Sequence, residues 1–105
     1  MNRTTKLREL LTKRFKPIFL DIQNESSKHH VPLHAETHFK IVMVAEVFAS
    51  LSPVARHRLL YKVCQEELEQ GLHALSLQLF TPYQWQTRHQ QVMPSPNCRG
   101  GFEHS

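Results

Sequence analysis

The stretch GLHALSLQLF, residues 71–80, decides the fold because its side chains alternate as those of a β-strand with one buried face do. The alternation divides them between two faces: His73, Leu75, Leu77 and Leu79 on one, and Leu72, Ala74, Ser76, Gln78 and Phe80 on the other. Gly71 separates this strand from the segment before it, and Pro82 ends it because proline has no amide hydrogen to donate. We therefore expect His73 at the first position of a strand, at the rim of the domain and on the face toward the helices.

His73 has two interpretations at this stage. A histidine at the end of a strand is usually a hydrogen-bonded packing residue, and it is also well placed to offer a ring nitrogen to a ligand. The spacing of the sequence alone leaves both interpretations open.

The N-terminal part of the chain predicts a helix followed by a strand. Residues 5–15 carry one apolar stripe at helical spacing, formed by Leu7, Leu10, Leu11 and Phe15. Pro17 ends this helix, because the residue before a proline is pushed out of the helical region. Residues 18–23 then alternate as a strand, with Ile18, Leu20 and Ile22 on one face.

A polar segment, residues 24–36, separates this strand from the next. It has no periodicity and contains His29, His30 and His34, and connections of this length are usually either functional or disordered. Residues 37–47 alternate again and predict a second strand. Its side chains divide into Phe39, Ile41, Met43 and Ala45 facing inward, and His38, Lys40, Val42, Val44 and Glu46 facing outward.

Helical sequence runs from Ser52, which can cap the free amides, to about residue 70, with a break expected near residues 63–65. Cys64 lies in its apolar stripe, so we expect a core residue rather than a reactive thiol. Three glutamates near the end of this segment are expected to be exposed: Glu66, Glu67 and Glu69. A short helix over residues 81–88, with Trp85 packing it onto the sheet or the first helix, follows the third strand.

These elements predict a small α+β domain. Strands one and two can pair antiparallel through their loop, whereas strand three returns after a helical crossover and should lie parallel to strand two. We expect helices on one face of a three-stranded mixed sheet, in the order αββααβα. The predicted domain spans residues 1–89, and residues 90–105, which have prolines, glycines and no periodicity, predict a flexible tail.

Composition narrows the class of protein. The chain has 105 residues, enough for one domain, and two cysteines that do not indicate a disulfide framework, so we expect a reducing cytoplasm. No apolar run approaches the length of a membrane span, and no membrane partner is expected. The formal net charge is +4, with one basic group in the first sixteen residues and a second formed by Arg56, His57, Arg58 and Lys62. The second group could contact nucleic-acid phosphates, or it could be a solvated helix face or hold the helix in place.

The sequence contains no arrangement of residues that indicates catalysis. It lacks a glycine-rich phosphate loop, paired carboxylates at a plausible spacing, and a nucleophile motif with a neighbouring histidine. We therefore do not expect an enzyme. A closed metal site generally needs four ligands, so His29 and His73 would supply only half of one.

Several motifs, in the same order along the chain, resemble the BolA family: ETHFKIVMVAEVF (36–48), SPVARHRLLYKV (52–63), EELEQGLHALSL (66–77), TPYQW (81–85) and SPNCRGG (95–101). The resemblance covers nearly the whole chain, from Leu7 to Gly101. It implies a KH-like fold of type II. The chain has no G-x-x-G, so the backbone clamp of nucleic-acid-binding KH domains does not transfer.

The resemblance also implies a function. BolA-like proteins are associated with monothiol glutaredoxins, with which they share a [2Fe-2S] cluster in iron homeostasis, and some are described as stress-responsive, DNA-binding regulators of transcription that affect cell shape. The family's ligand scheme maps onto His73 and, through the pattern ESxxHxVP, onto His29, with His30 as the alternative loop ligand. The glutaredoxin cysteine and a glutathione thiolate complete the set, so the chain alone is expected to hold no cofactor and to be a monomer or a weak homodimer. The alternative hypothesis is DNA binding through the basic helix.

Overall fold

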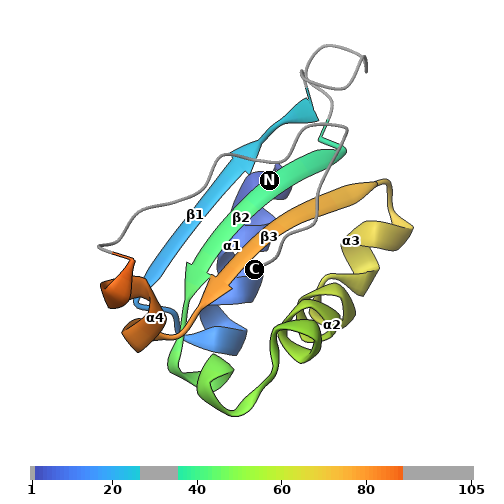
Figure 1. The fold of residues 1–105 in the computed structure, drawn as a ribbon. Coiled ribbons are helices and arrows are strands. Elements are labelled where there is room, and N and C mark those ends of the chain that lie inside the picture. Colours follow the sequence, from blue (N-terminus) through green and yellow to red (C-terminus); the bar gives the residue numbers. More distant parts are fainter. Residues whose placement is uncertain (1, 27–35, 89–105) are drawn as a thin grey trace, which may run out of the picture.

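The computed structural model describes residues 2–26 and 36–88 and has one sheet with four α-helices (Figure 1). The elements are α1 (Arg3–Phe15), β1 (Phe19–Asn24), β2 (His38–Val44), the 3₁₀ helix η2 (Glu46–Ser50), α2 (Pro53–Val63), α3 (Gln65–Glu69), β3 (Ala74–Phe80) and α4 (Pro82–Thr87). This order confirms the predicted αββααβα arrangement. The predicted tail and the loop histidines His29, His30 and His34 lie outside the described residues.

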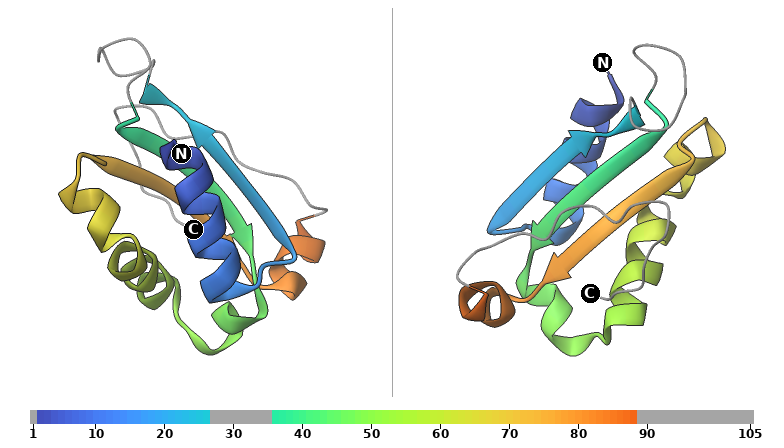
Figure 2. Two further views of the ribbon diagram at one scale, coloured as in Figure 1. Left: turned by 180° about the vertical axis from the view of Figure 1, so that it is seen from behind. Right: turned by 45° about the horizontal axis from the view of Figure 1, so that its top comes forward.

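The sheet has three strands in the order β1-β2-β3. β1 pairs antiparallel with β2, with Phe19 opposite Val44, and β2 pairs parallel with β3, with His38 opposite Ala74. Both pairings were predicted. α1, α2 and α3 cover one face of this sheet, as the two further views make clear (Figure 2).

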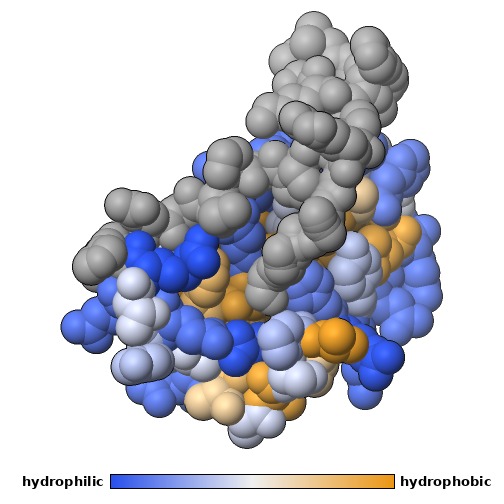
Figure 3. Space-filling model, viewed as in Figure 1, coloured by the Kyte–Doolittle hydropathy of each residue, from blue (hydrophilic) through white to orange (hydrophobic). Residues whose placement is uncertain are grey.

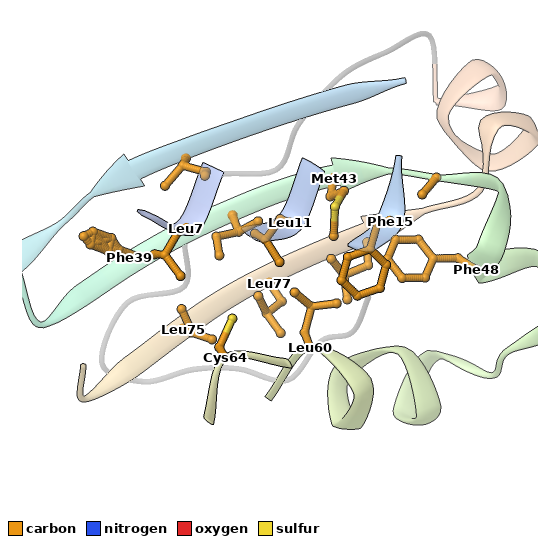
Figure 4. Packing of buried hydrophobic residues seen from close by; sticks show 14 of the residues in the cluster. Leu7, Leu11, Phe15, Phe39, Met43, Phe48, Leu60, Cys64, Leu75 and Leu77 are labelled. Carbon is orange, nitrogen blue, oxygen red and sulfur yellow. The ribbon is translucent and has the colours of Figure 1, made fainter. Parts of the chain in front are cut away.

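The main core lies between that face and the helices (Figure 4). The predicted inward residues of all three strands and the stripe of α1 contribute to it, among them Leu7, Leu11, Phe15, Ile22, Phe39, Ile41, Met43, Leu75, Leu77 and Leu79. Ile18 was grouped with Leu20 and Ile22 on one face of the first strand, but it is 63% exposed. It precedes the first residue of β1 and lies at the margin of the sheet, beyond the end of α1.

A second, smaller cluster occupies the opposite face of the sheet. It contains Val42, Val44, Phe80 and Trp85. The Trp85 ring stacks on Phe19, with ring centroids 5.0 Å apart, and lies 5.5 Å from Phe80. Trp85 thus packs α4 onto the sheet as predicted, but on the face opposite α1–α3, where its ring contacts Phe19 and Phe80. The capping box of Thr81 and Gln84 starts α4 directly after β3.

Several element boundaries differ from the predicted ones, and the differences at α1 and β2 have a clear cause. α1 begins at Arg3 rather than residue 5 because the Asn2 side chain accepts a hydrogen bond from the Thr5 amide, at 2.9 Å. β2 ends at Val44, three residues before the predicted end, because the chain turns into η2 and buries Phe48 in the main core. The predicted break in the long helical segment is confirmed at Cys64, between α2 and α3.

Hydrophilic residues cover most of the described surface on the face seen in Figure 3, with apolar residues between them. The large exposed apolar side chains include Tyr83, Ile18, Val54 and Val47. Among the described residues, the helices are too short or too polar to cross a membrane.

Candidate functional site

His73 lies immediately before β3, at the end of the sheet where β2 and β3 begin and opposite the end that carries α4 (Figure 1). Its amide donates to the carbonyl of Thr37 at 2.8 Å, and the next amide, of Ala74, donates to the same oxygen at 3.1 Å. In a regular strand successive amides point in opposite directions, so the strand geometry does not extend back to His73. Leu72 is accordingly buried in the main core, and His73 is exposed rather than facing the helices as predicted.

Among the described residues, the ring of His38 lies beside that of His73. The two imidazole centroids are 5.9 Å apart and the rings meet edge to face, at 82°. Nδ1 of His38 lies 2.8 Å from the Thr37 hydroxyl. Sequence reasoning put His38 on the outer face of strand two and gave it no role; only the parallel register, with His38 opposite Ala74, could have brought it beside His73.

Ser26 joins the two ends of the connection that carries the loop histidines. Its hydroxyl oxygen accepts hydrogen bonds from the amides of Thr37, at 3.0 Å, and His38, at 3.1 Å. The Ser26 amide in turn donates to the Asn24 side chain at 3.0 Å. The backbone of Thr37 and His38 is therefore also held from the end of β1.

Arg3 ties the same end of the sheet to α1. Its Nε donates to Glu67 Oε1 at 2.8 Å, one NH₂ group donates to the carbonyl of Gln70 at 2.9 Å, and the other donates to the carbonyl of Glu36. Glu36 leads into β2 and Gln70 begins the turn before His73, in which Gly71 has a φ of +117°. Sequence reasoning did not predict this contact, since it counted Arg3 only as part of the basic group in the first sixteen residues.

The glutamates at the end of the helical segment only partly match the sequence prediction. Glu66 and Glu69 are exposed, as expected. The prediction is wrong for Glu67, whose side chain is 12% exposed because it pairs with Arg3.

Cys64 is fully buried in the main core. Burial, together with the nearby charge of Glu67, raises the pKa of its thiol to about 11. A thiol that stays protonated and buried is a poor nucleophile and a poor metal ligand. The interpretation of Cys64 as a core residue is thus confirmed.

Arg56 is not on the surface where the nucleic-acid hypothesis needs it. It is 6% exposed, and its guanidinium donates to the carbonyls of Phe48 (3.1 Å), Leu51 (3.1 Å) and Leu79 (3.2 Å) and to Gln84 Oε1 (2.8 Å). Burial lowers the pKa of this guanidinium. These contacts hold α2 to η2, β3 and α4, as the alternative interpretation expected for Arg56, and they occupy the guanidinium that the nucleic-acid hypothesis would use.

The other members of the predicted basic group differ in exposure. His57 is half-buried, and this burial lowers its pKa. Arg58 and Lys62 are exposed on α2, and residues four apart lie on the same side of a helix. The structure therefore leaves two fixed charges from this group at the surface.

A metal site is not complete within the described residues, which contain no group of three or more histidine, cysteine, aspartate or glutamate side chains able to hold an ion. The donors at the His73 end of the sheet are imidazoles. Imidazole suits iron, copper and zinc, and it replaces thiolates on one iron of some [2Fe-2S] centres.

Comparison with known proteins places the chain in a family. The family model described as BolA-like protein matches residues 11–84. This chain belongs to the BolA family. The matched range includes both His38 and His73.

Relatives in bacteria and animals cover most of the chain. The DNA-binding transcriptional regulator BolA of Vibrio cholerae is 44% identical over 95 residues, 90% of this chain and 90% of that protein. BolA-like protein 1 of Homo sapiens is 44% identical over 97 residues, 92% of this chain and 67% of that protein. The solution structure of BolA1 from Mus musculus has a TM-score of 0.76 and 40% identity, covering 91% of this chain and 77% of that chain. BolA relatives are thus named as regulators or as BolA-like proteins.

Proposed function

We propose that this BolA protein is not an enzyme and that it shares a [2Fe-2S] cluster with a monothiol glutaredoxin. The observation that supports the proposal best is the setting of His73, whose imidazole is exposed and whose amide donates to the carbonyl of Thr37, the residue before β2. A ligand whose backbone is already ordered loses little further entropy when it binds.

In this proposal the chain supplies imidazole and the partner supplies sulfur. His73 is one ligand, and His29, or His30 beside it, is the second. The glutaredoxin cysteine and a glutathione thiolate complete the set of four ligands. Because both thiols must stay reduced, the proposal also assigns the protein to a reducing compartment. Replacing thiolates by neutral imidazoles makes the bound cluster less negative and raises its reduction potential.

The contacts around Arg3 support the proposed role of His73. Arg3 holds both chain segments that flank the site, at Glu36 and at Gln70, to the start of α1. The segments before β2 and before His73 can thus meet a partner with their backbone already held in place.

The test is reconstitution under anaerobic conditions with a monothiol glutaredoxin, glutathione, iron and sulfide. We expect a heterodimer with one cluster and with visible absorption and circular dichroism spectra distinct from those of the glutaredoxin homodimer. Recovery of only the homodimer spectrum, with the BolA chain eluting separately, would contradict the proposal.

DNA binding is the second candidate, because the relatives of Vibrio cholerae and Escherichia coli, 44% and 39% identical to this chain, are named DNA-binding transcriptional regulators. In this chain the exposed Arg58 and Lys62 would contact phosphates, without Arg56. Contacts of this kind bind all sequences and weaken steeply with salt. We expect Arg58→Ala with Lys62→Ala to weaken binding to every duplex and to reduce its salt dependence, whereas unchanged binding by the folded double variant would remove α2 from this hypothesis.

A further inference from the structure

We propose that two copies of this chain associate through the end of the domain that carries α4, by an exposed apolar patch formed by Ile18, Phe19, Val47 and Tyr83. This α4 end lies opposite the end that carries His73 (Figure 1). The proposal goes beyond cluster sharing, because it assigns a second interaction surface and needs no glutaredoxin. It rests on the exposure of these side chains, on the contacts that gather their segments, and on two unpaired charges of opposite sign beside them.

Four large apolar side chains are exposed at the α4 end. The exposed fraction is 75% for Tyr83, 63% for Ile18, 43% for Val47 and 38% for Phe19. Scattered apolar residues are common on the surfaces of soluble proteins, whereas apolar residues gathered in one place mark interaction sites. Elsewhere in the described part of the chain, the large apolar side chains exposed to this degree are two on α2, Val54 and Tyr61.

Backbone hydrogen bonds bring the segments that carry the patch together. The Ile18 amide donates to the carbonyl of Val44 at 2.8 Å, and the Ala45 amide donates to the carbonyl of Phe80 at 3.0 Å. The start of β1 and the ends of β2 and β3 are therefore adjacent. η2, which carries Val47, begins directly after Ala45.

α4 is held beside the same strand ends. It begins two residues after the end of β3, and the ring of Trp85 stacks on Phe19 with the centroids 5.0 Å apart. Trp85 is buried by this packing, whereas Tyr83 of the same short helix is exposed. The patch thus draws its side chains from three segments that meet at the α4 end: the start of β1, η2 and α4.

Two exposed charges of opposite sign flank the patch. Lys16 precedes Ile18 by two residues, and Glu46 directly precedes Val47. The described residues contain one ion pair, between Arg3 and Glu67, so Lys16 and Glu46 are unpaired there.

This arrangement of charges complements itself. In an interface with two-fold symmetry each contact occurs twice with the roles of the two copies exchanged. Lys16 of each copy can therefore meet Glu46 of the other while the apolar side chains cover one another. A second copy of the chain is thus a partner that fits both the apolar patch and the charges beside it.

The proposed dimer is compatible with the site at the other end of the sheet. Because His73 lies opposite the α4 end, association through the patch leaves His73 of both copies accessible. A patch of four side chains is small for a permanent interface, so the dimer should be weak and should form at high protein concentration.

The experiment is sedimentation analysis of the full chain over a wide range of protein concentrations. A Cys98→Ser background excludes disulfide-linked dimers, and a chelator excludes dimers linked by metal ions. We expect a reversible equilibrium between monomer and dimer. Ile18→Ser with Val47→Ser should raise the dissociation constant about tenfold or more by removing apolar contact area. Both residues are exposed, so circular dichroism and Tm should show an unchanged fold.

A charge exchange tests the predicted pairing. Lys16→Glu and Glu46→Lys should each raise the dissociation constant about tenfold, because each places like charges opposite one another. The variant that carries both substitutions should return toward the wild-type constant, because the pair forms again with its signs exchanged. Arg8→Glu makes the same charge change as Lys16→Glu at another exposed position of the N-terminal segment, and it should leave the dissociation constant unchanged.

Three results would overturn the proposal. They are a chain that stays monomeric at every concentration, a dimer that Ile18→Ser with Val47→Ser leaves unchanged, and a charge exchange that fails to restore association. None of these results bears on cluster sharing, because no glutaredoxin, glutathione or iron is present.

Discussion

Arg56 should be among the most important residues for stability, although its residue type and neighbours in the sequence indicate a surface contact. Its guanidinium joins η2, β3 and α4 to α2 through the hydrogen bonds to Phe48, Leu79 and Gln84. In Arg56→Ala these acceptors lose a charged donor, and each such hydrogen bond contributes about 1.5–3 kcal/mol. Allowing for water reaching the less buried acceptors, we expect the free energy of unfolding to fall by about 4 kcal/mol.

The assay is urea and thermal unfolding, with Arg58→Ala as the matched control on the same helix. For a domain of this size about 1 kcal/mol changes Tm by roughly 4–8 °C, so Arg56→Ala should lower Tm by roughly 15–30 °C. Arg58 is exposed, and its variant should stay within about 0.5 kcal/mol of the wild type. Arg56→Lys keeps the charge but not the planar fork, and should recover only a small part of the loss. Equal effects of Arg56→Ala and Arg58→Ala would refute the structural role of Arg56.

Three further predictions concern the ends of the domain and its thiol. Arg3→Ala should lower the free energy of unfolding by about 2 kcal/mol through loss of its charged hydrogen bonds. Arg8 is exposed on the same helix, so Arg8→Ala should leave this free energy unchanged. Equal urea midpoints of the two variants would contradict the contacts of Arg3 at Glu36 and Gln70. In a Cys98→Ser background, Cys64 should resist iodoacetamide at pH 8, since its thiol is buried with a pKa of about 11, and modification without denaturant would show that the core opens. Truncation after His89 should leave Tm nearly unchanged, because residues 90–105 have prolines, glycines and no apolar periodicity. A loss of several degrees would show that they pack.

Local patterns in the sequence predicted most of the fold. Alternation over residues 71–80 identified the buried face of β3, and the residue types at Ser52 and Thr81 predicted helix starts that the structure confirms with side-chain caps. The break at Cys64 and the buried stripe of α1 followed from helical spacing. These features depend on residues within a few positions of one another, so the sequence alone contains them.

Contacts between distant segments were not predictable in the same way. His38 and His73 meet because β2 and β3 pair parallel in one particular register. For Arg56 the sequence left a phosphate contact, a solvated face and a structural role open, and for Arg3 it indicated no partner. Only the fold brings backbone carbonyls to their guanidinium groups. The ligand role of His73 was implied by the resemblance to the BolA family. Composition and spacing alone left open whether His73 packs or binds a ligand.

The most direct test of cluster sharing is the spectrum of the heterodimer formed by the His73→Ala variant. His73 is exposed and its backbone hydrogen bond does not need the imidazole, so the variant should fold and still bind apo-glutaredoxin. We expect it to fail to give the visible circular dichroism spectrum of the wild-type heterodimer, whereas His29→Ala should give an altered, shorter-lived cluster and His57→Ala the wild-type one. A His73→Ala heterodimer with the wild-type spectrum and cluster lifetime would show that His73 is a packing residue and not a ligand.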